Sequence, residues 1–520
     1  MANQAERTEL HKTIWTIANE LRGSVDGWDF KAYVLGTIFY RFISENICDY
    51  IHQIMVKLGN PDFDYTTMPD DQAINAKQQM VEEKGYFILP SQLFQNVIKD
   101  VDNNNNLNET LSEIFNAIEA SAIGTPSEED LRGLFSDFVV DNSKLGATVI
   151  TRNQLLAKVM KAVANMDLGS KYNDTANDTF GDTYEYLMQM YASQAGKSGG
   201  EYFTPQKVSE LLAQLASYNN PNIQKVYDPA CGSGSLLLKF AKTVGKNNPN
   251  LKYFGQEINP TTYNLCRINM FLHNVNYDNF DIQLDDTLIH PCHMSEAPFD
   301  AIVSNPPYSL KWEGKDNPLL INDERYAPAT VLAPKSAADL AFIMHILWHL
   351  SETGTAAIVE FPGVLYRSGA EKKIREYLIK NNFIDTIIQL PQNLFFGVGI
   401  ATCIIVLKKS RKSTSDVLFI DASNQCRKDG NKNVMDDKHI ENIMTAFAKR
   451  KDEKYFCKVV SNDDILKNDS NLSVSSYVEQ EDTREKIDIK AVNAKLEALV
   501  AENNELNKKI EAIIKELEGE

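Results

Sequence analysis

Apolar positions in the first third of the chain recur at the spacing of amphipathic helices. Between residues 10 and 21 they fall at Leu10, Ile14, Ile17, Ala18 and Leu21. Further apolar-rich helical runs lie at 32–43, 111–118 and 155–163, whereas the DNNNN stretch at 102–106 has the composition of a loop. Because this region contains no strand-rich stretch and no catalytic motif, we predict a helical accessory domain over residues 1–165.

From about residue 180 the pattern changes to short apolar runs that alternate with helical segments. The predicted strands are 225–227, 252–255, 280–284, 301–304, 355–359, 384–389 and 401–407. The predicted helices between them include 235–244, 261–274, 338–350 and 370–381. This alternation predicts an α/β domain over residues 166–478, with a Rossmann-like, mostly parallel, doubly wound sheet. Ligands of such sheets bind at the carboxyl ends of the strands.

The segment 479–520 is predicted to contain an amphipathic helix with a coiled-coil-like seam. Its seam positions alternate in steps of three and four and are Ile489, Val492, Leu496, Leu499, Asn503, Leu506, Ile510, Ile513 and Leu517. One interpretation is a helix packed on its own domain. We favour pairing with helices of a partner chain, because a seam this long needs a continuous apolar surface to cover it, and one polar position such as Asn503 often fixes register.

Composition and charge restrict the class of protein. The chain has 520 residues with a net charge of −18, so it repels a phosphate backbone on average, and any action on nucleic acid requires a local basic groove or a basic partner. Seven scattered cysteines without a CxxC pair argue for reduced thiols and against a zinc ribbon, so no metal site is expected. Without an apolar leader or a run of ~20 apolar residues, the expectation is a cytoplasmic protein with no membrane partner.

The first chemical motif is the turn 228–235 (DPACGSGS), which follows a predicted strand and opens a helix. Gly232 and Gly234 allow a tight turn close to a ligand, and Glu257 at the end of the next strand is placed to accept hydrogen bonds from ribose hydroxyls. The turn lacks a third glycine and the Gly-Lys-Ser/Thr signature, so a mononucleoside cofactor such as S-adenosylmethionine fits best. A glycine turn of an ordinary α/β unit is the alternative.

A further acidic pair, Asp285 and Asp286, follows the predicted strand 280–284. A carboxylate at that strand end is placed to accept from the adenine amino group of a cofactor. A turn or capping role is equally compatible with the sequence, and the pattern does not decide which of the two residues would contact the cofactor.

The second motif is Asn305-Pro306-Pro307-Tyr308, directly after the buried apolar run 301–304. The prolines fix the backbone and remove donors, which leaves the Pro306 carbonyl and the Asn305 side-chain oxygen as acceptors for the two N–H bonds of an amino group. Holding both protons out of the ring plane redirects the nitrogen lone pair towards an electrophile. The Tyr308 ring offers a face on which a planar base can stack.

Taken in order, the segment 200–205 (GEYFTP), the glycine turn and the Asn-Pro-Pro-Tyr motif resemble N6-adenine DNA methyltransferases. A longer match resembles the modification subunit of type I restriction-modification systems, and the resemblance extends over essentially the whole chain. The segments of this match are 28–30 (WDF) with 33–36 (YVLG), 203–205 (FTP), 393–397 (NLFFG) and 471–477 (NLSVSSY).

The resemblance implies roles for individual residues. The catalytic residues would be Asn305, Pro306, Pro307 and Tyr308. The cofactor-binding residues would be Glu201, Tyr202, Phe203, Thr204, Pro205, Gln206, Asp228, Gly232, Ser233, Gly234, Ser235, Glu257 and Asp286. Tyr308 and Phe396 would stack on the target base, with Phe395 as the alternative to Phe396 and a core role open for either.

The resemblance also implies partners that reconcile an acidic chain with DNA. It implies double-stranded DNA as substrate with an extruded adenine, a separate specificity subunit that reads the sequence, two modification subunits for each specificity subunit, and a restriction/translocase subunit in the full complex. Local basic contacts are expected from the loop 309–335, with Lys311, Lys315, Arg325 and Lys335, unless the loop is merely solvated. The rival functions are methylation of cytosine N4 or of a glutamine amide, and a non-catalytic assembly subunit.

Overall fold

The computed structural model describes most of the chain, which divides into two units, 1–478 and 479–520. The described residues are 29–166, 186–187, 204–244, 248, 250–395, 399–410, 414–430, 432–480 and 488–519. The three domain ranges given above remain predictions.

Helices dominate the start of the first unit, as the sequence predicts. The three longest are α2 (Asp29–Lys57), α6 (Leu107–Ser121) and α8 (Val149–Ala164), and the short ones are α3 (Asp70–Ala73), α4 (Lys77–Lys84), α5 (Phe94–Val97) and α7 (Glu128–Leu131). The predicted helical runs at 32–43, 111–118 and 155–163 lie inside α2, α6 and α8, and the predicted loop at 102–106 is a turn. The predicted helix at 10–21 lies outside the described residues.

A nine-stranded sheet forms the centre of the rest of the first unit, with the order β11-β8-β6-β7-β5-β4-β1-β2-β3. Its strands are β1 (Lys225–Asp228), β2 (Lys252–Glu257), β3 (Phe280–Leu284), β4 (Phe299–Ser304), β5 (Leu350–Glu360), β6 (Ile384–Gln389), β7 (Cys403–Lys408), β8 (Asp416–Asp421) and β11 (Cys457–Ser461). The short strands β9 (Arg427–Asp429) and β10 (Lys432–Val434) form a separate antiparallel hairpin.

The sheet is mostly parallel, which confirms the predicted α/β class. Strands β3, β2, β1, β4 and β5 pair in parallel, as do β6 and β8, whereas β7 and β11 run antiparallel to their neighbours. The chain progresses outwards from β1 through β2 to β3 and then returns to place β4 on the other side of β1. The strand order therefore reverses between β1 and β4, where open α/β sheets bind their ligands.

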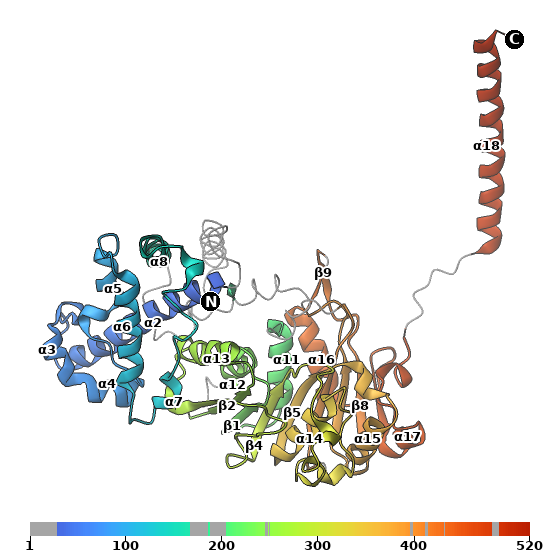
Figure 1. The fold of residues 1–520 in the computed structure, drawn as a ribbon. Coiled ribbons are helices and arrows are strands. Elements are labelled where there is room, and N and C mark those ends of the chain that lie inside the picture. The colour runs from blue at the N-terminus through green and yellow to red at the C-terminus, as the bar shows by residue number, and fades with distance from the viewer. Residues whose placement is uncertain are drawn as a thin grey trace. The chain divides into compact units, whose positions relative to one another are not determined.

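Helices cover both faces of the sheet (Figure 1). Buried side chains of α11 (Gln206–Ser217), α12 (Ser235–Val244), α13 (Pro260–Leu272) and α16 (Asp437–Lys449) belong to one hydrophobic cluster. Those of α14 (Asp339–His349), α15 (Ala370–Lys380) and α17 (Asn462–Lys467) belong to the other. Along β4, Ala301 and Val303 join the first cluster and Ile302 the second. The alternation follows from the two-residue period of a strand.

The helical region packs on the sheet region through α13. Arg267, which is 1% exposed, donates to the backbone carbonyls of Glu129, Asp130 and Arg132 at 2.9–3.1 Å. The rings of Phe39 and Phe271 lie 6.2 Å apart, inside the same hydrophobic cluster. The helices before residue 166 and one face of the sheet thus share a continuous core.

The second unit contains one long helix, α18 (Ile489–Glu518). Asp488 caps its amino end by accepting from the backbone N–H groups of Lys490 and Ala491, and Gly519 ends it in the left-handed conformation at φ 76°. Its 30 residues extend over roughly 45 Å, and no side chain of α18 is buried, including those of the predicted seam. Among the described helices of the whole chain, none combines the length and apolarity needed to cross a membrane.

Candidate active site

The glycine turn joins β1 to α12 at the point where the strand order reverses. Gly232 and Gly234 adopt φ values of 54° and 77°, in the region that favours glycine. A Cβ on Gly234 would lie 2.8 Å from Cys266 Sγ, so only glycine lets α12 approach α13 this closely. Ser233 and Ser235 are buried, and the Ser233 carbonyl accepts from Asn269 Nδ2 at 2.9 Å. The turn is therefore held rigidly against α13.

Glu257 at the end of β2 lies against this turn, as expected of a ribose-binding acid. Its carboxylate accepts from the backbone N–H of Gly232 at 3.0 Å and from that of Asn259 at 2.8 Å. Burial raises the pKa of Glu257, although these N–H bonds oppose the shift. Since a carboxylate offers about four acceptor positions, the group keeps capacity for hydroxyl donors. The turn and the acid fit a nucleoside cofactor.

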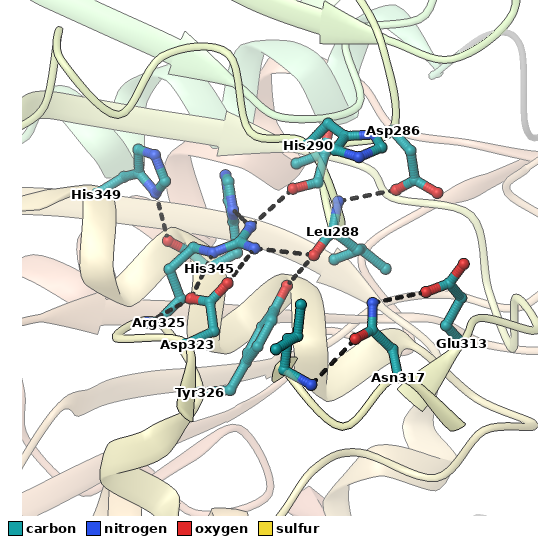
Figure 2. Close-up of polar contacts among 12 residues, drawn as sticks. Asp286, Leu288, His290, Glu313, Asn317, Asp323, Arg325, Tyr326, His345 and His349 are labelled. Atoms are coloured by element: carbon teal, nitrogen blue, oxygen red, sulfur yellow. Dashed lines mark hydrogen bonds and ion pairs between the residues drawn. The ribbon is translucent and has the colours of Figure 1, made fainter. Parts of the chain in front are cut away.

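Asp286 has a turn role in the structure (Figure 2). Its carboxylate accepts from the backbone N–H of Leu288 at 2.9 Å, and Asp285 accepts from the backbone N–H of Asp286 at 2.7 Å. The turn interpretation is thus confirmed for Asp286. Its contact with a cofactor stays a prediction.

The Asn-Pro-Pro-Tyr motif begins where β4 ends, and a hydrogen bond ties it to the glycine turn. Ser304, the last residue of β4, donates from Oγ to Asp228 Oδ1 at 2.8 Å. Asp228 is fully buried, and burial raises its pKa to about 7 although Ser304 and the Ala230 N–H donate to it. The two predicted motifs therefore occupy adjacent strand ends.

Asn305 is half-buried, and both ends of its amide have partners. Its Nδ2 donates to Thr204 Oγ1 at 3.1 Å, and the Tyr308 hydroxyl donates to its Oδ1 at 2.6 Å. Burial raises the pKa of Tyr308 well above its usual value, with the carboxyls of Glu360 and Asp339 adding to the shift, so the hydroxyl keeps its proton. A carbonyl oxygen has two lone pairs, so the bond from Tyr308 alone does not saturate the Asn305 oxygen.

The segment before α11 reaches the catalytic corner through Thr204. Thr204 is buried, Pro205 occupies the N-cap position and Gln206 is the first residue of α11. The structure thus places one predicted cofactor residue, Thr204, directly on Asn305. Glu201, Tyr202 and Phe203 lie outside the described residues.

The aromatic pair expected at the target base is only partly described. Phe395 is 4% exposed and belongs to the hydrophobic core, as the core alternative for this residue predicts. Phe396 lies outside the described residues, so its stacking role stays a prediction.

Sequence reasoning missed a group of buried carboxyls near Tyr308. Glu360 ends β5, is fully buried, and neither of its oxygens has a hydrogen-bond partner among the described residues. Asp339 accepts from the Ser309 N–H at 2.9 Å through one oxygen, and Glu371 is also buried. Burial raises the pKa of Glu360 well above its usual value. The signal that points to it is a carboxyl directly after the apolar run 356–359.

Arg325 does not belong to an exposed basic surface, so the expectation that it contacts DNA is wrong. The side chain is fully buried, pairs with Asp323 at 2.7 Å, and donates to the carbonyls of Thr287 and Leu288 at 2.8 and 2.9 Å (Figure 2). It also donates to Nδ1 of His345 at 3.0 Å. A guanidinium carries only donors, and here all of its recorded partners are internal acceptors.

The hydrogen bonds of Arg325 also support the glycine turn, through Thr287. Thr287, whose carbonyl Arg325 holds, donates from Oγ1 to the Pro229 carbonyl at 2.6 Å. Burial lowers the pKa of His345 well below its usual value, so the ring is neutral and its Nε2–H faces the Tyr227 hydroxyl at 3.0 Å. Among the described residues, no group of three or more histidines, cysteines or carboxyls is arranged to hold a metal ion.

Comparison with known proteins finds one family model that matches the helical region and another that matches the sheet region. Residues 175–486 match the model of the N-6 DNA Methylase family, and residues 10–163 match the HsdM N-terminal domain. The type I restriction enzyme MpnII methylase subunit of Mycoplasma pneumoniae is 47% identical, over 98% of this chain and 97% of its own. The MjaVIII methylase subunit of Methanocaldococcus jannaschii is 31% identical, over 69% of this chain and 64% of its own.

Solved structures agree. The type I restriction-modification methyltransferase subunit from Streptococcus thermophilus is 36% identical, with a TM-score of 0.82 over 91% of this chain and 99% of its own. A structure described in connection with complex assembly and conformational transition of the type I system has a TM-score of 0.63 over 100% of this chain at 18% identity, and supports the fold alone.

Proposed function

Because this chain belongs to the N-6 DNA methylase family, as a type I restriction enzyme methylase subunit, we propose that it methylates N6 of an adenine extruded from duplex DNA. It is an adenine-specific DNA methyltransferase of the S-adenosylmethionine-dependent class. The extruded base, the residues that hold it and the source of sequence specificity are the content of the proposal.

One observation carries the proposal, namely the 2.8 Å hydrogen bond between Ser304 and Asp228. It joins the ends of β4 and β1, so the corner that would hold the amino group adjoins the turn that would hold the cofactor. Catalysis by positioning requires reacting atoms about 3–3.5 Å apart and in line. Two rigid motifs at neighbouring strand ends can meet that requirement.

The chemistry follows from the acceptors of the corner. Asn305 Oδ1 and the Pro306 carbonyl accept the two N–H bonds of the target amino group, which turns the nitrogen lone pair out of the ring plane. S-adenosylmethionine, when bound, supplies an electrophilic methyl group on its sulfonium sulfur. The N6–C bond forms as the S–C bond breaks, and a proton leaves N6 for solvent. Asn305 is neutral, so it positions and polarises rather than acting as a strong base.

The target base has to compete with Tyr308 for Asn305. The Tyr308 hydroxyl occupies Asn305 Oδ1 at 2.6 Å in the structure. An entering amino group either shares this oxygen through its second lone pair or displaces the hydroxyl. The Tyr308 ring then offers its face to the base, as aromatic side chains do in base-flipping enzymes.

Partner subunits are expected to read the DNA sequence and to complete the complex. We propose that a separate specificity subunit reads the DNA sequence, that two modification subunits flank it, and that a restriction/translocase subunit completes the complex. The apolar seam of α18 is the proposed contact with partner helices, since its eight apolar positions are at least half exposed. Together with the predicted role of Asn503 in fixing register, this supports a helical partner.

Mapping of methylated bases tests the proposal. The chain is co-purified with a candidate specificity subunit, and DNA exposed to the complex and S-adenosylmethionine is sequenced for modified bases. We expect N6-methyladenine at one recognition sequence. Methylation at cytosine N4 or of a protein glutamine would overturn the substrate. Cofactor binding and complex assembly without transfer to DNA would point to an assembly subunit.

A further inference from the structure

The loop that follows the catalytic corner encloses a pocket outside the site described above. Residues 309–338 fold back on themselves, because Leu310 accepts from the Ala338 N–H at 2.9 Å and Trp312 donates from its backbone N–H to Lys335 at 3.1 Å. The pocket on this loop has a volume of about 850 Å³. Ligand pockets range over roughly 300–1,000 Å³, so the space suffices for a ligand.

The charged side chains that line this pocket are all lysines. Lys311, Lys315 and Lys335 line it, and none of the described lining residues is acidic. Lys335 forms an ion pair with Asp316, whereas Lys311 and Lys315 form none with the residues that the structure describes. In a chain with a net charge of −18, a pocket lined by three lysines and no carboxylate favours an anionic occupant.

The remainder of the lining suits the phosphate and the apolar part of a nucleotide. Ile321 and Leu332 contribute apolar surface, and Ala370, the first residue of α15, also lines the pocket. Gly369 precedes this 11-residue helix and provides no side-chain cap. The first turn of this helix already carries the carboxyl of Glu371, so the positive charge of the pocket comes from its lysines.

The position of the pocket, close to Tyr308 in the sequence, indicates which anion it binds. Lys311 follows Tyr308 by three residues, so their Cα atoms lie at most roughly 11 Å apart. Phosphates along one DNA strand are spaced by about 3.4 Å of helix axis. A nucleotide held at Tyr308 therefore brings its neighbouring phosphates within reach of the lysine side chains.

We propose that this pocket binds the backbone of the DNA strand that carries the target adenine, with Lys311 and Lys315 on phosphates one to three nucleotides from the extruded base. The inference rests on the proposed function and adds a specific phosphate-binding site to it. Such contacts fix the position of the strand without reading its sequence. They provide the local basic surface that an acidic chain needs.

The salt dependence of DNA binding tests the proposal. The assembled modification complex is compared with one that carries Lys311→Gln and Lys315→Gln, using a duplex that contains the mapped recognition sequence. Each lost phosphate contact lowers the slope of log affinity against log salt by about 0.9. We expect the magnitude of this slope to decrease by roughly 2 in the double variant. The ratio of the DNA affinity of the unmodified complex to that of the variant should then shrink ~12-fold as the salt rises from 50 to 200 mM. Cofactor affinity should not change.

A matched variant controls for charge alone. Lys252 at the start of β2 and Lys380 at the end of α15 are exposed at the opposite, amino edge of the sheet. Lys252→Gln with Lys380→Gln removes the same charge and should leave the slope unchanged. An equal fall in both double variants would show a general charge effect and overturn the proposal.

Neutral methylphosphonates placed singly along the target strand locate the contact. At one to three nucleotides from the adenine they should weaken binding of the unmodified complex, with little further effect on the Lys311→Gln, Lys315→Gln complex, as expected for directly coupled groups. An unchanged salt slope with normal methylation would overturn the pocket and leave the proposed function intact. Weakened subunit assembly at an unchanged slope would instead assign the pocket to a protein partner. Absence of methylation by the unmodified complex would count against the proposed function itself.

Discussion

The carboxyl edge of the sheet and the helix α18 differ in what their side chains contact. At the edge, polar side chains of distant segments bond to one another, as Ser304 does with Asp228 and Thr204 with Asn305. On α18, a seam of apolar side chains lies exposed along the whole helix. The first surface is organised by the chain's own contacts, whereas the second has the pattern of a surface that a partner completes.

The carboxyl edge has the features of a catalytic site, whereas α18 has the features of an assembly surface. A site held within about 0.5 Å needs rigid supporting contacts before its ligand arrives, and the edge has them. A coiled-coil seam gains its stability only when a second helix covers it. Substitutions at the edge should therefore change transfer or folding without affecting assembly, and substitutions on α18 should do the reverse.

The largest effect is expected from Asn305→Ala. The substitution removes one of the two acceptors for the amino group and should lower the methyl-transfer rate by roughly 10³-fold, the size of effect seen when one polar group of a preorganised site is removed. Single-turnover methylation assays measure the rate, and calorimetry should show unchanged cofactor affinity. Asn75→Ala, at an exposed position, serves as control. A variant that transfers at the normal rate would contradict the role of Asn305.

Arg325→Met tests whether the edge is supported from within. The substitution leaves the Thr287 carbonyl without the Arg325 donor, the Leu288 carbonyl with the Tyr326 hydroxyl alone, and Asp323 without its cation. We therefore expect a loss of about 3 kcal/mol in the free energy of unfolding. Denaturant unfolding measures it. Lys380→Met at an exposed position should cost no more than about 0.5 kcal/mol. Equal effects of the two variants would contradict the structural role of Arg325.

Charges on the seam of α18 test assembly. Leu499→Glu with Leu506→Glu should weaken binding of the specificity subunit at least ~100-fold, about 2.7 kcal/mol, because carboxylates would lie in an apolar interface. Ala494→Glu with Ala501→Glu adds the same charge away from the seam. Analytical ultracentrifugation separates the outcomes, and cofactor binding should be normal in both variants. Normal assembly of the seam variant would show that the helix has another role.

The effect that is smallest over any one pH unit is a pH dependence of stability due to Asp228, which is spread over about three pH units. Burial raises its pKa to about 7 from an ordinary value of 3.8, so the folded protein holds a proton that the unfolded chain releases. Stability from this group is present below about pH 4 and is lost as the pH rises towards 7, by at most about 1.4 kcal/mol per pH unit. Asp228→Asn should flatten that part of the curve, measured by denaturant unfolding. An unchanged curve would place the proton elsewhere.

Much of the sheet could be predicted from the sequence, because its strands are continuous apolar runs. Strand β6 and helix α12 have their predicted bounds of 384–389 and 235–244, whereas β5 starts five residues before the prediction, at Leu350. Strands β8 and β11 were missed. Strand β11 lies at the edge of the sheet with three of its five residues not buried, so its apolar signal is weak. Strand β8 is as long as β6 and five of its six residues are buried, so its signal was present in the apolar run 417–420.

For the site, motifs were easier to predict than the contacts around them. The sequence pointed to Asn305 and the glycine turn, since proline and glycine restrict the backbone locally. It could not show that Arg325 is buried or that Glu360 lies near Tyr308, because both facts depend on segments far apart in the chain. Exposure of a basic residue is a property of the fold rather than of its neighbours in sequence.

The hydrogen bond from Tyr308 to Asn305 also bears on how the product leaves. An adenine amino group offers two N–H bonds, whereas its methylated form offers one. After transfer, the base can satisfy only one of the two acceptors, and the tyrosine hydroxyl is at hand to reclaim the asparagine oxygen. In the proposed mechanism, the same contact that the substrate must overcome on entry thereby favours release of the methylated base.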